Sequence, residues 1–398
     1  MQIQHARRPD SAQTPGGAPF ALWALGMRPF YLLASVFAAV SIPLWALQYA
    51  GVLPVQYVPS AAWHGSEMLL GYTLAVVTGF LLTAVRNWTG QPTASGAHLA
   101  ALAAVWLAGR VLAATRFEVA AACVDVAFPL VVAASIGRPL WRARNRRNFF
   151  FVGLLLLLSC AALVLHLSAL DVVAWPERTT LRVVLDVMML IMAIMGGRVI
   201  PMFTANAIPG AHARRHPAVE RAALGGIVVL IVADAIGAPG WLMLPLTSAL
   251  AAVHAARLAL WQPWRTVHKP LVWVLHAAYA WIVLHLVLRA LAAAGLVPDP
   301  LAVHALTVGA IGGLTLGMMT RTARGHTGRP LVADRRDVAM YTLVFAAALI
   351  RVGGPLAWPS AYVGTVLAAG TCWSLAFALY AWSYAPSLVR ARADGRPG

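Results

Sequence analysis

Long apolar stretches recur along nearly the whole chain of 398 residues, and short polar loops separate them. Stretches such as 60–86 and 301–323 have the length of about 20 residues that an α-helix needs to cross the hydrocarbon core of a membrane. With 61% hydrophobic and 11% charged residues, the chain contains more apolar surface than a water-soluble core can bury. The sequence therefore predicts an all-α polytopic membrane protein that is surrounded by a lipid bilayer and has no sizeable soluble domain.

Hydropathy and turn residues predict about twelve transmembrane helices. The predicted spans are 29–50, 60–86, 97–115, 117–137, 148–170, 181–208, 218–238, 240–260, 270–294, 301–323, 336–353 and 360–386. Together they form a single transmembrane domain at 21–389. Residues 1–20 are predicted to be a disordered cytoplasmic tail, since they lack the apolar region of a signal peptide. Residues 390–398 are predicted to be a short basic cytoplasmic tail.

The basic residues fall in alternate loops when the N-terminus is placed in the cytoplasm. The predicted inner loops then hold clusters such as the arginines of segment 138–147, whereas the predicted outer loops hold only Arg178 beside several acids. This positive-inside pattern predicts an even number of spans with both termini cytoplasmic. It also accounts for the net charge of +17 without nucleic acid as a partner, because exposed aromatic residues do not interleave with the basic ones.

Two segments that lie far apart in the sequence share one pattern. The segments beginning at His64 and His304 each run through mostly apolar residues and end in R-x-x-T-G-x-P, at Pro92 and Pro330. If both helices cross in the same direction, each histidine lies about 6 Å below the outer surface. Two imidazoles that face each other in a helix bundle can hold a haem iron. The pattern predicts His64 and His304 as ligands of a haem b, and the alternative for each is an interhelical hydrogen bond.

Other residues near these histidines, and elsewhere in the spans, are candidates for metal and proton chemistry. Glu67 shares a helix face with His64, so it is the candidate catalytic residue, either orienting the imidazole or donating a proton. Met68 is a soft donor that suits copper, and His276 is the candidate for a second metal site. We expect His166 and His285 to be hydrogen-bonding groups. His254 is predicted to lie at the membrane interface.

Three arginines fall within the outer half of predicted spans, where a charge needs a partner. They are Arg110, Arg289 and Arg351. A guanidinium suits bidentate binding of a haem propionate. The alternative is that these arginines pair with the buried aspartates Asp125, Asp186 and Asp234.

Two glycine-containing motifs predict local helix geometry. Gly309, Gly313 and Gly317 recur every four residues, which predicts a stripe for close helix packing. The run from Gly196 to Pro201 is predicted to break its helix, because proline removes a backbone hydrogen bond.

Several short motifs in order along the chain are similar to those of the NnrS family. They are R-P-F at Arg28, W-H-G-x-E-M at Trp63, N-W-T-G at Asn87, G-G-R-V-I-P-x-F-T-x-N at Gly196, L-H-x-x-Y-A-W at Leu275, H-A-L-T-V-G-A-I-G at His304 and G-H-T-G-R-P at Gly325. The resemblance implies a multi-pass protein of the bacterial inner membrane that contains haem and copper. It also implies nitric oxide as a partner, in nitrosative-stress or denitrification metabolism. The expected activity is that of a haem-dependent oxidoreductase acting on nitric oxide, and no motif identifies quinol or another electron donor.

Comparison with haem-copper oxidase and nitric oxide reductase subunits supports paired histidines on spans two and ten. Spans six and seven of this chain contain no histidine within the bilayer, and span ten contains one where those subunits need two. The sequence therefore excludes an oxidase-type binuclear centre. Two other functions remain open, a secondary transporter of a metal or of haem and a non-catalytic nitric oxide sensor. The loop signature of major-facilitator transporters is absent after span two, where the sequence reads RNWTGQPTASG.

Overall fold

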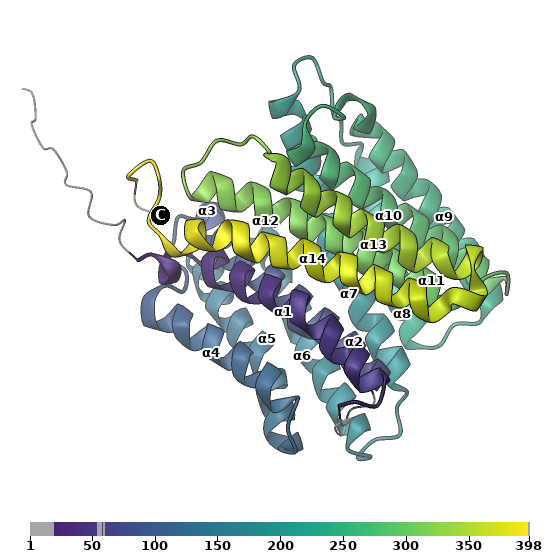
Figure 1. Ribbon diagram of the computed structural model, residues 1–398. Helices are drawn as coiled ribbons and strands as arrows, with labels where there is room; N and C mark the ends of the chain where they lie inside the picture. Colours follow the sequence, from purple (N-terminus) through teal and green to yellow (C-terminus); the bar gives the residue numbers. More distant parts are fainter. Residues whose placement is uncertain (1–19, 54–57, 59, 397–398) are drawn as a thin grey trace, which may run out of the picture.

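The computed structural model describes residues 20–53, 58 and 60–396. The predicted tail at 1–20, except Phe20, and the last two residues lie outside this range. Long helices, packed side by side, make up the bundle (Figure 1). The described part of the chain forms no strand apart from an isolated bridge between Phe20 and Arg390. The prediction of an all-α fold is confirmed.

In the part of the chain that the structure describes, ten long helices are continuous α-helices. They are α1 (Met27–Tyr49), α4 (Gly96–Leu112), α5 (Glu118–Arg142), α6 (Phe150–Ala169), α7 (Glu177–Ala207), α8 (Pro217–Ala235), α9 (Gly240–Leu260), α10 (Pro270–Ala293), α13 (Arg335–Ala357) and α14 (Tyr362–Val389). Short 3₁₀ turns lie beside some of them, at η1 (Leu22–Ala24), η3 (Arg146–Asn148), η4 (Pro263–Arg265) and η6 (Pro359–Ala361).

Two further helices are composite, because a π-helical segment interrupts each of them. The His64 helix consists of α2 (Ser60–Ser66), the π segment η2 (Glu67–Thr73) and α3 (Leu74–Thr89). The His304 helix consists of α11 (Asp299–His304), the π segment η5 (Ala305–Gly312) and α12 (Gly313–His326). In the most apolar 18-residue stretch of each of these two helices, 89% and 72% is buried inside the bundle. The corresponding share is 67% for α7 and less for the other candidate spans. The two histidine-bearing helices therefore form the centre of the bundle.

Ten helical segments within the described residues are long and apolar enough to cross a membrane. The two other predicted spans fall on α4, which has 17 residues, and on α8, which carries Glu220, Arg221 and Asp234. The polytopic membrane class is therefore supported. Twelve crossings and the cytoplasmic location of the termini stay predictions.

The two ends of the described chain meet at the same end of the bundle (Figure 1). The backbone N–H of Ala21 donates to the carbonyl of Val389 at 2.7 Å. The buried Arg28, from the R-P-F motif, donates to the carbonyls of Leu388 at 2.9 Å and Arg390 at 2.7 Å. These carbonyls end α14 and lack partners within the helix, so Arg28 satisfies them. A chain whose ends meet in this way passes through the bundle an even number of times.

The glycine stripe of the His304 helix packs directly on α10, as predicted. A Cβ atom at Gly309 would lie 2.2 Å from the Trp281 ring, and one at Gly313 would lie 2.7 Å from the Ala278 side chain. Gly317 faces Val274 in the same way at 2.9 Å. Only glycine permits this close approach of the two helices.

The predicted break at Pro201 is wrong. Helix α7 continues through Pro201 to Ala207. A neighbouring helix packs on this stretch, and the Arg257 guanidinium of α9 donates to the carbonyl of Ala193 at 2.9 Å. The same guanidinium packs against Gly197, where an added Cβ would lie 2.0 Å from Arg257 Nη2. Polar side chains from neighbouring helices let a membrane helix tolerate proline.

Candidate functional site

Each candidate ligand histidine lies shortly before the π segment of its helix. His64 lies in the last turn of α2, three residues before η2 begins at Glu67. His304 is the last residue of α11, and η5 begins at the next residue. A π segment inside an α-helix is a rare feature that occurs frequently at functional sites. The sequence similarity between the two segments thus extends to an unusual local geometry.

The imidazole of His304 is oriented by its own helix. Its Nδ1 lies 2.7 Å from the carbonyl oxygen of Pro300. Because a carbonyl only accepts hydrogen bonds, Nδ1 carries the proton and Nε2 keeps its lone pair. The side chain is half-buried. This tautomer and orientation are those of a metal-ligating histidine.

The imidazole of His64 is held by stacking. Its ring lies 4.6 Å from the ring of Trp45 in α1, at an interplanar angle of 29°. No other residue in the described part of the chain forms a hydrogen bond with His64, so the alternative of an interhelical hydrogen bond is not seen there. Among the residues that the structure describes, none competes by hydrogen bonding for the ring nitrogens of this half-buried side chain.

His64, His304 and Arg351 gather in one region. The two imidazoles are close enough to interact electrostatically with each other. Both are also close enough to interact with the Arg351 guanidinium of α13. Arg351 is 9% exposed, and it contacts the Tyr362 hydroxyl at 3.4 Å. It has no carboxylate partner within residues 20–53, 58 and 60–396. A buried cation without a carboxylate partner marks a place for an anionic group.

Glu67 lies in a buried charge cluster that joins four helices. Arg110 of α4 bonds both to Glu67 of η2 and to Asp125 of α5. Asp125 Oδ2 also lies 3.3 Å from Nε2 of His166 in α6. We call these four residues the Arg110 cluster. Arg110 thus takes the predicted role of partner for an aspartate, and His166 is the hydrogen-bonding group that was expected.

Two glycines make room for the Arg110 cluster. A Cβ at Gly71 would lie 2.7 Å from Arg110 Nη1, and one at Gly109 would lie 2.5 Å from Asp125 Oδ1. The indole N–H of Trp106 donates to the carbonyl of Gly71 at 3.0 Å. This carbonyl lies in the π segment, so Trp106 supplies it with a partner from outside the helix.

Arg289 lies in a second ion-pair cluster, beside the His304 helix. Its guanidinium lies 3.2 Å from Asp186 of α7 and 2.7 Å from Asp234 of α8. Arg182 continues the cluster to Asp299, the first residue of α11. Arg289 is therefore already paired with carboxylates, which was the alternative to its binding a haem propionate.

His285 also fixes α11, because its Nδ1 lies 2.7 Å from the carbonyl of Ala302. This contact confirms the expected hydrogen-bonding role of His285.

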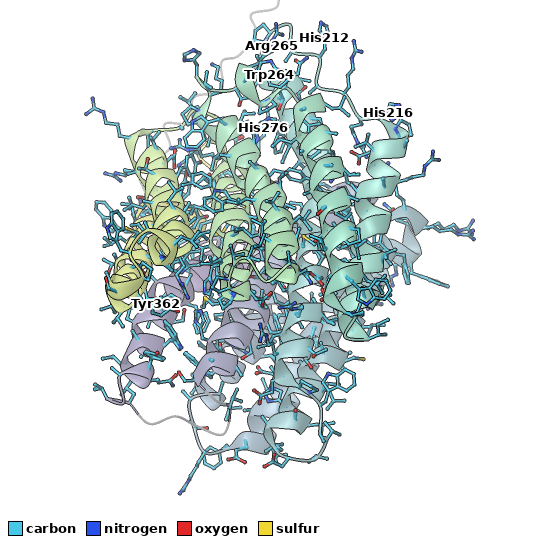
Figure 2. The ribbon with its side chains drawn as sticks, turned by 90° about the vertical axis from the view of Figure 1, so that its right-hand side faces the viewer. His212, His216, Trp264, Arg265, His276 and Tyr362 are labelled. Atoms are coloured by element: carbon cyan, nitrogen blue, oxygen red, sulfur yellow. The ribbon has the colours of Figure 1, made fainter. Side chains whose placement is uncertain are left out.

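His276 and Met68 lie apart from a recognisable metal site. His276 Nε2 bonds to Thr204 Oγ1 at 2.8 Å, and its buried Nδ1 has no partner in the described structure. Figure 2 shows His276 near the end of the bundle that carries Trp264 and Arg265, whereas Tyr362 lies toward the other end. Met68 packs against the apolar core. Within the described residues, no group of three or more His, Cys, Asp or Glu side chains has the arrangement of a metal site.

His254, predicted to lie at the membrane interface, is packed inside the bundle, and its depth in the membrane stays a prediction. Its side chain is 0% exposed, and its Nδ1 bonds to the Tyr279 hydroxyl at 2.7 Å. A buried hydrogen-bond partner on the neighbouring helix α10 removes the need for the imidazole to reach water.

The sequence analysis missed residues that hold the histidines in place. Trp45 stacks on His64, and Tyr72 joins the His64 helix to Thr315 of the His304 helix. An aromatic residue in an apolar span carries no sequence signal that distinguishes such a contact from ordinary core packing.

Comparison with known families places nearly the whole chain in one family. The chain matches the family model described as NnrS protein over residues 21–392. No curated protein matches the chain in sequence. The family match covers both histidine-bearing helices and both ion-pair clusters. The chain therefore belongs to the NnrS family.

Proposed function

We propose that this protein is a b-type haem protein of the bacterial inner membrane that binds or turns over nitric oxide. His64 and His304 would hold its iron. One observation carries the proposal: two imidazoles each lie shortly before a π segment, and they are close enough to interact electrostatically with each other. Membership of the NnrS family supports nitric oxide as the partner.

The residues around the two histidines fit a haem. Ligation requires imidazole lone pairs, which the Pro300 contact leaves on His304 Nε2 and which His64 has without a competing hydrogen bond. Propionates require a cation, and the Arg351 guanidinium has no carboxylate partner in the described chain. When bound, the haem supplies electron transfer and coordination of nitric oxide.

Each of these residues then has a defined task. Pro300 fixes the tautomer of His304, and Trp45 fixes the ring plane of His64. Arg351 binds a propionate. Surrounding apolar side chains exclude water, which strengthens the electrostatic interactions inside the site.

The Arg110 cluster supplies protons. Glu67 and Asp125 carry two carboxylates against the single guanidinium of Arg110. A buried cluster with an excess negative charge is costly, so binding of one proton by its carboxylates would offset that cost. Glu67 is the member nearest to His64 in sequence, at a separation of one helical turn. We assign it the delivery of protons that the reduction of nitric oxide consumes.

Copper enters the proposal through the family resemblance. His276 offers a buried Nδ1 without a partner, and Met68 offers a thioether one residue after Glu67. Each would need further donors, so the copper position stays open between them. A quinol or another donor would supply the electrons.

The competing functions differ in what they do with haem. A secondary transporter of a metal or haem is compatible with two interrupted helices at the centre of the bundle. A sensor would bind nitric oxide without consuming it. Both are separated from the proposal by the experiment below.

The test is haem content and nitric oxide consumption of protein purified in mild detergent. Wild-type protein and the loop variant His216→Ala should contain equal haem per chain and consume nitric oxide with a reductant. His64→Ala and His304→Ala should each lose haem while eluting as folded protein. Full haem in both variants would refute the ligand assignment. Haem without consumption would favour the sensor, and substrate-dependent uptake into proteoliposomes would favour the transporter.

A further inference from the structure

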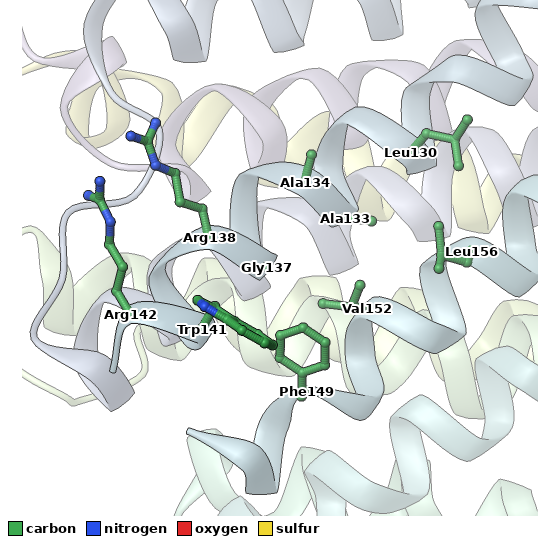
Figure 3. A pocket seen from close by; sticks show the side chains of 10 residues that line it. All are labelled: Leu130, Ala133, Ala134, Gly137, Arg138, Trp141, Arg142, Phe149, Val152 and Leu156. Atoms are coloured by element: carbon green, nitrogen blue, oxygen red, sulfur yellow. The ribbon is translucent and has the colours of Figure 1, made fainter. Parts of the chain in front are cut away.

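A groove lies between α5 and α6, on a part of the molecule distant in sequence from both histidines. Its volume is about 500 Å³. Ala133, Ala134 and Gly137 of α5 form one wall, and Val152 and Leu156 of α6 form the other (Figure 3). The small α5 side chains create the hollow. A Cβ at Gly137 would still lie 3.6 Å from Val152, so the two helices do not close on each other there.

The groove faces outward from the bundle. The most apolar windows of α5 and α6 are only 33% and 44% buried, against 89% for the His64 helix. In a bilayer, an outward apolar surface of a membrane-spanning helix meets lipid acyl chains. The hollow is therefore shaped to take a lipid chain instead of a protein side chain.

One end of the groove is strongly basic. Arg138 and Arg142 line it there, and Figure 3 shows both side chains extending toward the same side, near Trp141 and Phe149. Neither arginine has an ion-pair partner among the residues that the structure describes. The loop that follows adds Arg144, Arg146 and Arg147 without an acid. A phosphate is the natural partner for such guanidinium groups, since arginine binds it in a bidentate manner.

Aromatic residues mark the same end as the level of the lipid headgroups. Trp141 is 76% exposed, and its ring lies 6.1 Å from the Phe149 ring. Exposed tryptophan is typical of the membrane interface. The basic end of the groove thus coincides with the depth at which phosphates lie, while Leu130 and Leu156 lie at the opposite, apolar end (Figure 3).

We propose that the α5–α6 groove is a binding site for one anionic glycerophospholipid. An acyl chain lies between Ala134, Gly137 and Val152, and the phosphate lies against Arg138 and Arg142. A zwitterionic lipid carries a compensating ammonium group beside its phosphate, so it gains less from this uncompensated positive charge. This site is separate from the proposed haem chemistry and does not depend on it.

Native mass spectrometry of the full chain tests the site. Protein in detergent is mixed with equal amounts of phosphatidylglycerol and phosphatidylcholine, and retained lipid is identified by mass. Wild-type protein should retain one phosphatidylglycerol in preference to phosphatidylcholine. R138Q/R142Q should reduce that preference by about fivefold per arginine. The matched control R214Q/R221Q removes two exposed arginines, one before α8 and one in its first two turns, that have no ion-pair partner in the described chain, and it should leave the preference unchanged.

A second variant tests the acyl part of the site. Ala134→Trp fills the hollow without changing charge, so it should abolish retention of both lipids. Retention that persists in Ala134→Trp would show that only the headgroup is bound, and would overturn the groove as the site. Equal loss in R138Q/R142Q and R214Q/R221Q would show a general charge effect. Either result, or an absence of preference in the wild-type protein, contradicts the proposal.

Discussion

The hydroxyl groups of Tyr72 and Thr315 lie 2.6 Å apart and join the His64 helix to the His304 helix. The Thr315 hydroxyl also donates to the carbonyl of Ile311 at 2.6 Å. Tyr72 is therefore the donor in the contact between the two helices. It ties together the two segments whose similarity is visible in the sequence, and so it helps to set the separation of the two histidines.

Tyr72→Phe should lower the free energy of unfolding by about 1 kcal/mol, the usual net value of a buried hydrogen bond. It should also shift the haem spectrum, because the separation of the two histidine-bearing helices changes. Tyr341→Phe is the matched control, since its hydroxyl pairs with Thr320 in the same way. Thermal unfolding and optical spectra check both variants. An equal spectral shift in the control would contradict the specific role of Tyr72.

Gly71→Ala should destabilise the protein by more than about 1 kcal/mol, the lower end of typical overpacking costs. The added Cβ would meet Arg110 Nη1 at 2.7 Å and Glu67 Oε2 at 2.9 Å, which forces the ion pair apart. Gly153→Ala in α6 is the control, because nothing lies within 4 Å of its added Cβ. It should be neutral or stabilising, since alanine favours helix by up to about 1 kcal/mol. Thermal unfolding in detergent compares the two, and equal effects would argue against a tight Arg110 cluster.

Arg110→Met should be the most damaging single change in its cluster. It leaves Glu67 and Asp125 as buried carboxylates without a cation, which costs about 3–5 kcal/mol. Adding Glu67→Gln and Asp125→Asn to the same chain should restore most of the folded yield, because no buried charge then remains unpaired. Size-exclusion profiles and thermal unfolding measure the effect. The control is Arg138→Met, because Arg138 is exposed and has no ion-pair partner in the described chain. If Arg110→Met is as stable as Arg138→Met, the ion pairs of Arg110 do not stabilise the fold.

Asp334 begins α13 with a capping box, which predicts a pH dependence. Its carboxylate accepts from the backbone N–H groups of Arg336 at 2.8 Å and Asp337 at 3.1 Å. Slight burial raises the pKa of Asp334, but the Asp337 N–H and the Arg324 charge outweigh it, so the pKa is lowered overall. A lowered pKa stabilises the fold above the unfolded value of about 3.9 and loses this effect as the pH falls through the folded value.

Asp334→Ala should therefore lose about 1 kcal/mol at neutral pH, the usual cost of losing a helix cap. The difference from the wild-type protein should stay constant down to about pH 4 and shrink only below it. Asp334→Asn keeps an N-cap acceptor without a charge, so it should retain most of the stability and remove the pH dependence. Thermal unfolding across this pH range checks both. A difference that grows as the pH falls would contradict the assignment.

The helical class and the similarity of the two histidine-bearing segments were predictable because they rest on local patterns. Apolar length locates helices, and His64 and His304 begin two segments with the same ending. The glycine stripe was also predicted correctly, because Gly309 and Gly313 must face the helix that approaches most closely. Each of these features depends on neighbours in the sequence and not on the arrangement of distant helices.

The sequence did not determine the ion-pair partners of the buried arginines, because these partners depend on which helices lie next to each other. Arg110 lies beside both Glu67 and Asp125, and Arg289 beside both Asp186 and Asp234. No pattern in the sequence fixes these neighbours. The π segments were equally hidden, because one extra residue per turn leaves the apolar composition unchanged. The break at Pro201 was predicted from a local rule, whereas α7 continues through Pro201 within a bundle, where neighbouring helices can support a proline.

The most direct test of paired histidine ligation is electron paramagnetic resonance of the oxidised, purified protein. The account predicts a low-spin haem signal of the kind that two axial imidazoles produce, together with loss of that signal in both His64→Ala and His304→Ala. His285→Ala is not the control, because a variant that unfolds also loses the signal. His216→Ala is the control variant and should keep the signal. A low-spin bis-imidazole signal that survives in either ligand variant, or a wild-type protein without haem, would contradict the account.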